Sequence, residues 1–214
     1  MTVAVKVCGI TNMEDALMVA RAGADYLGFV LSDSLRRIDP ETARHIIAAL
    51  PDTARAVGVF VDEPLEDVNR LARQCGLDFV QLQGRESPEY CLHCEVPVLK
   101  GIHMGDPEAV RQVHDYDVAA LLFDTFVPGK AGGTGQAFDR RLLRALDYNG
   151  PFFLAGGLTP DTVGEAIRET SPFGVDVSSG VARSPRQKDQ DLVHQFLEAA
   201  HNNQKERRYA GRRL

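Results

Sequence analysis

The chain has 214 residues, of which 44% are hydrophobic, and it carries a formal net charge of −6 at pH 7. This length fits a single domain, and the hydrophobic content is too high for a disordered chain. The acidic balance argues against a general nucleic-acid-binding protein, whose surface would be basic, but it allows a local basic pocket.

The N-terminal residues MTVAVKVCGIT contain no long apolar region or cleavage signature. No segment approaches the roughly 20 apolar residues of a membrane span. We therefore expect a cytoplasmic protein without a membrane partner. In that compartment the four cysteines are expected to be thiols. Cys91 and Cys94 form a C-x-x-C motif, but no second ligand pair accompanies it, so we expect solvated helix residues and no metal.

Eight short apolar segments predict β-strands, and each is followed by an amphipathic or helix-like stretch. Helix signals stand between them: Asn12 is a predicted N-cap and Gly23 a predicted C-terminal glycine, while Pro40 and Pro160 occupy first helical positions. The predicted strands are 3–8, 25–31, 54–60, 77–83, 96–102, 117–124, 151–155 and 173–178.

Alternating apolar strands and helices predict a parallel sheet that is covered by helices. Eight regular units favour a single-domain (β/α)₈ TIM barrel over residues 1–201, with an open doubly wound sheet as the alternative. The glycine-rich dinucleotide fingerprint is missing after the first strand. Residues 202–214 are basic and predict a frayed, solvated tail, with an anion-binding arm as the alternative.

The active site of such a barrel lies at the C-terminal ends of its strands. Alternation along the first strand puts Lys6 and Cys8 on the inward face, and the same argument directs Asp124 and Asp176 into the barrel mouth. Taken alone, Cys8 also fits a core residue and an aspartate also fits a helix cap. An inward lysine is costly unless it is paired, which makes Lys6 harder to explain structurally.

Two glycine-rich stretches, at 154–160 and 176–185, follow the seventh and eighth predicted strands. Loops at these positions of a barrel often bind phosphate through backbone N–H groups. The pair therefore predicts a phosphorylated ligand, although either loop alone also fits a tight turn. A third glycine-rich loop, 129–138, predicts a flexible cover over the site.

With these residues in place the sequence resembles the phosphoribosylanthranilate isomerases of tryptophan biosynthesis. The likeness runs in order from Val5 to Asp189 and is carried by VKVCGIT, ADYLGFV, SLRRI, VGVF, VQLQG, FDT, GGTG, LAGGL and GVDVSSGV. It implies an isomerase that converts N-(5′-phosphoribosyl)anthranilate to an aminoketose by an Amadori rearrangement. Because this chemistry is proton transfer only, the resemblance implies no metal and no organic cofactor.

By matched position the resemblance implies that Asp124 is the general acid and Cys8 the general base. Arg36 would hold the anthranilate carboxylate, and Lys6 would favour the thiolate of Cys8 by its charge. Gln81 and Asp176 would be polar walls of the site, and the backbone of Gly156, Gly157, Ser179 and Gly180 would hold the phosphate. The expected partner is this small phosphoribosyl substrate, on a monomer or homodimer, with no nucleic acid.

Three positions depart from the family pattern. The family's QLHG is written with Gln83 here, its Phe-Asp-Trp ends on Arg140, and the glutamate after SSGV is Ala182. A histidine's proton-handling role therefore cannot be transferred to Gln83. Two rival functions remain at this stage: the analogous histidine-pathway isomerase, which carries an aspartate where Cys8 stands, and a non-catalytic sugar-phosphate-binding barrel.

Overall fold

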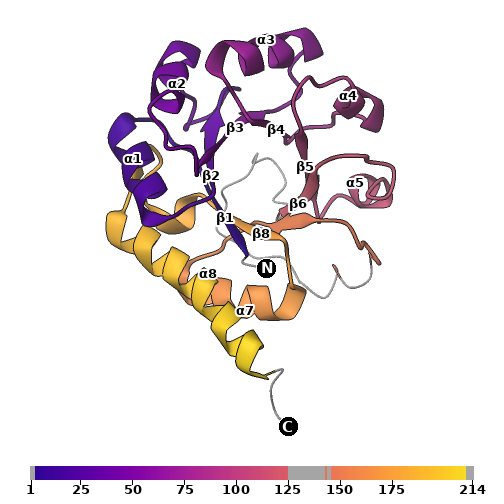
Figure 1. Ribbon diagram of the computed structural model, residues 1–214. Helices are drawn as coiled ribbons and strands as arrows, with labels where there is room; N and C mark the ends of the chain where they lie inside the picture. Colours follow the sequence, from indigo (N-terminus) through magenta and orange to yellow (C-terminus); the bar gives the residue numbers. More distant parts are fainter. Residues whose placement is uncertain (1–2, 125–142, 144–145, 211–214) are drawn as a thin grey trace.

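The computed structural model describes residues 3–124, 143 and 146–210, with side chains described as far as residue 202. Eight parallel strands form a closed barrel in which each strand pairs with the next and β8 pairs with β1 (Figure 1). The single-domain (β/α)₈ barrel is therefore confirmed, and the open sheet is excluded. The strands are β1 (Ala4–Cys8), β2 (Tyr26–Val30), β3 (Arg55–Phe60), β4 (Phe79–Leu82), β5 (Val98–His103), β6 (Ala120–Asp124), β7 (Phe152–Leu154) and β8 (Gly174–Val177).

Helices lie around the outside of the barrel (Figure 1). The first helix has both predicted signals. It begins after Asn12, whose side chain accepts from the Asp15 N–H, and it ends at Gly23, which is in the left-handed conformation at φ +101°. The described helices are α1 (Met13–Ala22), α2 (Pro40–Ile47), α3 (Leu65–Cys75), α4 (Pro88–Leu92), α5 (Pro107–Arg111), α7 (Pro160–Thr170) and α8 (Gln190–Ala210). A short 3₁₀ turn, η1 (Ser179–Val181), and a small hairpin, β9 (Ala182–Ser184) with β10 (Gln187–Lys188), connect β8 to α8.

Strand alternation separates two apolar regions. Outward residues such as Val5, Val7 and Val175 join the large core under the helices. Inward residues at the N-terminal ends of the strands fill the barrel floor, where the ring of Tyr26 meets those of Phe79 and Phe153 edge-on at 5.6 and 5.4 Å. The floor is therefore largely apolar, and Lys6, Cys8, Gln81 and Asp176 lie above it, towards the strand C-termini.

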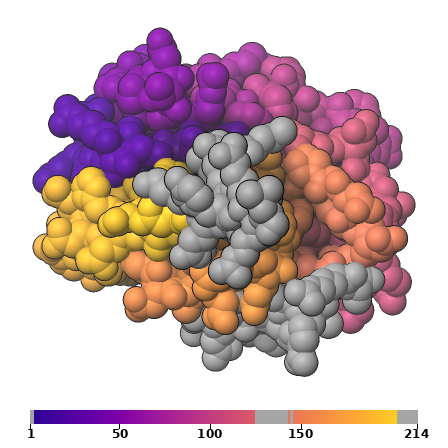
Figure 2. All heavy atoms as spheres, turned by 60° about the horizontal axis from the view of Figure 1, so that its bottom comes forward, coloured from indigo at the N-terminus to yellow at the C-terminus, as the bar shows by residue number. Residues whose placement is uncertain are grey.

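The first and last parts of the chain lie side by side on the surface, indigo beside yellow (Figure 2), because α1 packs on α8 and β1 pairs with β8. The backbone of α8 continues to Ala210. The proposed division at residue 202 and the fraying of the tail stay predictions. Among the helices that the structure describes, none is long and apolar enough to cross a membrane.

The cysteines are free thiols, as predicted. The expectation that the C-x-x-C motif is solvated was wrong for Cys91, which is 4% exposed. Helix α4 has only five residues, and it turns this side chain into the core. Burial raises the pKa of the Cys91 thiol to about 12 and that of Cys94 to about 11. Within the described ranges no group of three or more His, Cys, Asp or Glu side chains is arranged to hold a metal ion.

Candidate active site

Lys6 and Asp176 form an ion pair inside the barrel. The two residues are direct cross-strand partners of β1 and β8, and Lys6 Nζ lies 2.9 Å from Asp176 Oδ1. Lys6 is fully buried. Burial lowers the pKa of Lys6, but the Asp176 carboxylate and the Cys8 thiol raise it, and the net result is a pKa above its ordinary value. The lysine therefore stays charged at neutral pH, as its pairing requires.

Cys8 ends β1 on the inward face, directly above Lys6 along the strand. A Cβ on Gly28, its partner on β2, would stand 2.7 Å from Cys8 Sγ and 3.1 Å from Lys6 Nζ. The thiol and the ammonium thus share the space that glycine leaves open at this position. Any side chain at residue 28 would displace one of them, so the glycine is a requirement of the site.

Asp124 ends β6, and a chain of two amides leads to it. Gln83 Nε2 donates to Asp124 Oδ2 at 3.4 Å, and Gln81 Nε2 donates to Gln83 Oε1 at 2.9 Å. A Cβ on Gly101 would overlap the Gln83 amide, so the glycine of β5 makes room for it. The other amide atom of Gln81, Oε1, is buried without a hydrogen-bond partner among the described residues.

Arg36 reaches the same mouth from the loop between β2 and α2. Its side chain crosses Gly9, where a Cβ would stand 2.6 Å from Arg36 Cδ, and Gly9 itself has a φ of +82°. Arg36 Nε is buried and has no hydrogen-bond partner in the part of the chain described. The neighbouring Arg37 is exposed, as its position outside the motif predicts. A guanidinium with an unused buried donor is suited to a planar anion.

The two glycine-rich loops after β7 and β8 lie against each other. Gly156 and Gly157 both have left-handed backbones, at φ +88° and +65°. A Cβ on Gly180 would overlap the carbonyl oxygen of Leu158, so the loops meet backbone to backbone. Ser179 and Gly180 belong to η1, which begins directly after β8. The two predicted phosphate loops therefore form one continuous wall beside the β1 end.

Two sequence predictions fall outside the described residues: the cover loop at 129–138 and the Phe138-Asp139-Arg140 departure. Sequence reasoning missed Lys188, which is 5% exposed and donates to the Cys8 carbonyl oxygen at 2.6 Å. Ser178, the last residue of the predicted strand 173–178, was given no role, and its hydroxyl donates to the same oxygen at 3.0 Å. Lys188 lies in a polar stretch with no strand or helix periodicity, which gave no signal of its burial.

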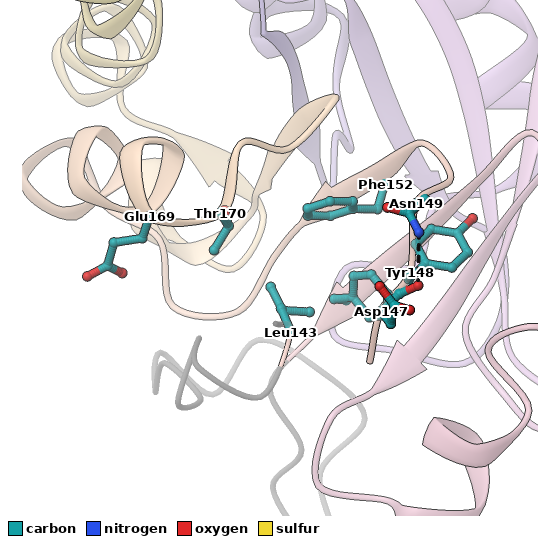
Figure 3. A pocket seen from close by; sticks show the side chains of 8 residues that line it. Leu143, Asp147, Tyr148, Asn149, Phe152, Glu169 and Thr170 are labelled. Atoms are coloured by element: carbon teal, nitrogen blue, oxygen red, sulfur yellow. Dashed lines mark hydrogen bonds between the residues drawn. The ribbon is translucent and has the colours of Figure 1, made fainter. Parts of the chain in front are cut away.

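A hollow of about 300 Å³ lies at another part of the barrel. Phe152 at the start of β7 and Thr170 at the end of α7 line it, together with Tyr148 and Asp147 (Figure 3). The carboxylate of Glu169 points away from these side chains in the same view. Among the described residues that line the hollow, none is an inward polar residue at a strand C-terminus, and these residues are not those of the candidate site.

Comparison with known proteins shows the family to which the chain belongs. The model of a family described as N-(5′-phosphoribosyl)anthranilate (PRA) isomerase matches residues 5–199. The chain belongs to this family. It is an isomerase of tryptophan biosynthesis, as the motifs of the sequence predicted. A PRA isomerase of Geobacter sp. (strain M21) is 48% identical over 197 residues, covering 92% of this chain and 97% of that relative.

Solved PRA isomerase structures share the fold. That of Thermotoga maritima superposes with a TM-score of 0.85 at 38% identity, covering 94% of this chain and 100% of the other. Another, at 37% identity and a TM-score of 0.83 with the same coverage, is described as a complex with reduced 1-(o-carboxyphenylamino)-1-deoxyribulose 5-phosphate.

Proposed function

We propose that this PRA isomerase converts N-(5′-phosphoribosyl)anthranilate to 1-(2-carboxyphenylamino)-1-deoxyribulose 5-phosphate by an Amadori rearrangement, with Asp124 as general acid and Cys8 as general base. The observation that carries the proposal is the meeting of Cys8 with two cations at the barrel mouth: Lys6 faces the thiol, and Arg36 crosses the next residue, Gly9. The solved relative with a reduced aminoketose phosphate supports the same substrate class.

The first step opens the ribose ring. Asp124 gives its proton to the ring oxygen as the C1′–O bond breaks, and the anthranilate nitrogen supplies the electron pair that forms the Schiff base. Gln83 donates to Oδ2 of Asp124 and so fixes the orientation of this carboxyl group. A positioned carboxyl group suffices for this proton transfer to the ring oxygen.

The second step removes the C2′ proton. The Cys8 thiolate takes it, the C–H electron pair forms the C1′=C2′ bond, and the iminium nitrogen becomes neutral. The resulting enolamine then gains a proton at C1′ while its C2′ hydroxyl loses one, which gives the ketone with no net change in atoms. Lys6 supports this step because its ammonium faces the sulfur and favours the thiolate.

Binding groups lie on either side of this pair. Arg36 offers its buried Nε to the anthranilate carboxylate. The wall formed by Gly156, Gly157, Ser179 and Gly180 offers backbone N–H groups to the phosphate, and Gln81 offers its buried Oε1 to a sugar hydroxyl. Asp176 is held by Lys6 and completes the polar wall. A monomer or a homodimer, acting without nucleic acid in the cytoplasm, stays the prediction for the assembly and its location.

The test is turnover of freshly prepared phosphoribosylanthranilate, followed as loss of substrate fluorescence, beside Cys8→Ala and Asp124→Asn. We expect fast conversion by the wild type and a loss of about 10²- to 10⁴-fold in kcat for each variant, the range of general acid–base catalysis. Both variants should still bind a reduced product analogue. No conversion by folded wild-type protein, with binding retained, would favour the sugar-phosphate-binding barrel. Conversion of the histidine-pathway substrate alone would favour that rival.

A further inference from the structure

Lys188 is a buried lysine that the proposed mechanism does not use. It lies in β10, the second strand of the small hairpin after η1, and it is 5% exposed although its neighbours in sequence are polar. Its backbone N–H donates to Asp15 Oδ2 at 2.9 Å, which fixes the hairpin to the first turn of α1. A buried ammonium is costly unless its donors are used, so its contacts indicate its role.

The ammonium of Lys188 joins the ends of two strands. Its Nζ donates to the carbonyl oxygen of Cys8 at 2.6 Å and to that of Ser178 at 3.0 Å. The ladder between β1 and β8 has Val7 and Val177 as its last paired residues. Cys8 and Ser178 are the next residue of each strand. Lys188 therefore holds the ends of β1 and β8 together at the point where their pairing stops. The Ser178 hydroxyl adds a further link, because it donates to the Cys8 carbonyl oxygen at 3.0 Å.

These two peptides belong to the two functional parts of the site. The first carries the thiol of Cys8, and the second leads into Ser179 of the predicted phosphate wall. In a trans peptide the C=O and the N–H point in opposite directions. The bond from Lys188 to Ser178 O thus turns the N–H of Ser179 away from the lysine. One side chain consequently sets the orientation of a phosphate-loop peptide and the position of the base.

We propose that Lys188 is a positioning residue of the isomerase: it clamps the carbonyl oxygens of Cys8 and Ser178 and so fixes the thiol relative to the phosphate-binding wall. The proposal rests on the proposed function. A substrate anchored by its phosphate presents C2′ to the base at a distance set by the protein, and a misplacement of about 1 Å can cost about 10²-fold in rate. Loss of the clamp therefore acts on kcat more than on binding.

Charged and titratable groups surround the clamp. Cys8 and Asp176 face Lys188 from β1 and β8, Arg36 from the loop after β2, and Asp15 from α1. Burial lowers the pKa of Lys188 to about 8, against the opposing effect of Cys8 and the two carboxylates. The charged form, whose hydrogen bonds are the stronger, is thus lost on the alkaline side of neutrality. A guanidinium at this position would stay charged there.

The experiment compares Lys188→Met and Lys188→Arg with wild type, with Arg183→Met as the control that removes an exposed cation from the same hairpin. Turnover of phosphoribosylanthranilate is measured from pH 6 to 9.5, beside thermal unfolding. We expect kcat of Lys188→Met to fall about 10- to 100-fold at pH 7 with KM changed less than about threefold. We expect Lys188→Arg to keep at least a fifth of the wild-type kcat and to retain it above pH 8, where the wild type declines. Arg183→Met should match wild type.

Each other outcome is decisive. A kcat of folded Lys188→Met within about twofold of wild type, or a loss confined to KM, overturns the clamp and leaves the proposed function intact. If Lys188→Met does not fold, the arginine variant decides: an alkaline limb identical to that of wild type overturns the proposal. Absence of turnover by the wild type sinks the proposed function, and the clamp with it.

Discussion

Two fully buried lysines lie on opposite faces of the barrel wall and are paired in different ways. Lys6 points inward and pairs with Asp176 at 2.9 Å beside the Cys8 thiol. Lys100 lies on β5 among residues that point outward, and it pairs with Glu86 at 2.8 Å. Lys100 also donates to the carbonyl oxygens of Leu82 and Gly84, at 3.2 and 2.7 Å.

The difference lies in what completes each pair. Three oxygens receive the three N–H donors of Lys100, and Glu86 Oε1 accepts from the backbone N–H groups of Asp62 and Gly84. The donors of Lys100 and both carboxylate oxygens of Glu86 thus have hydrogen-bond partners, and this closed pair joins the β4–α4 loop to the sheet. Lys6 instead faces a carboxylate and a thiol at the open end of the barrel. Burial and pairing alone therefore do not distinguish the two lysines, whereas the face of the strand on which each lies does.

The largest effect on stability is expected from Lys100→Met. The variant leaves Glu86 charged and buried without its partner, which costs about 3–5 kcal/mol. Urea unfolding should show this loss, while turnover of the protein that remains folded stays within about threefold of wild type. The double variant Lys100→Met/Glu86→Gln keeps a hydrogen-bond acceptor at residue 86 and should recover more than half of the loss. A stable single variant would contradict the closed-pair interpretation.

Lys6→Met should reverse this pattern. We expect kcat/KM to fall about 100-fold, because the thiolate loses its adjacent charge, and the free energy of unfolding to fall by about 1–3 kcal/mol. The rate of Cys8 alkylation at neutral pH, read by peptide mass, should fall in the variant because the charge beside the sulfur is gone. Cys91 and Cys94 give little background, because burial raises their pKa values to about 12 and 11. An unchanged alkylation rate would remove Lys6 from the mechanism.

The contributions of Lys6 and Lys188 to the free energy of unfolding should also differ in their pH dependence. The pKa of Lys6 is raised, so its contribution to stability is fully present below about pH 10.4 and is lost only above that. The stability difference between wild type and Lys6→Met should thus be constant from pH 6 to 9. The pKa of Lys188 is lowered to about 8. Above that pH the unfolded chain binds more protons than the folded one, so the free energy of unfolding of the wild type rises with pH. Lys188→Met lacks this increase. Parallel curves for all three proteins would contradict this assignment.

The smallest effect on kcat/KM is expected from Gln83→His, which restores the histidine of the family pattern. The imidazole keeps a donor that can face Asp124, so kcat/KM should stay within about fivefold of wild type. Gln83→Leu, which removes the donor, is the matched control and should lose about tenfold. A gain of more than tenfold in the histidine variant would show that the glutamine limits proton transfer from Asp124.

The strands and their inward faces could be predicted because a period of two sorts side chains without knowledge of the fold. Alternation alone directed Lys6, Cys8, Asp124 and Asp176 into one mouth. The burial of Lys188 could not be predicted, because a two-residue strand has no measurable period and its partners lie 10 and 180 residues away. The same limit explains Cys91, whose helix has only five residues.

The seam between β1 and β8 has a consequence for how the protein is made. The ion pair of Lys6 and Asp176 joins residues 170 positions apart. A ribosome releases the first strand with its lysine long before it releases the last one. Throughout that interval the charge of Lys6 lacks its carboxylate, and the thiol of Cys8 lacks its neighbouring loop. The seam that closes the barrel therefore also delays the pairing of Lys6 until β8 has been made.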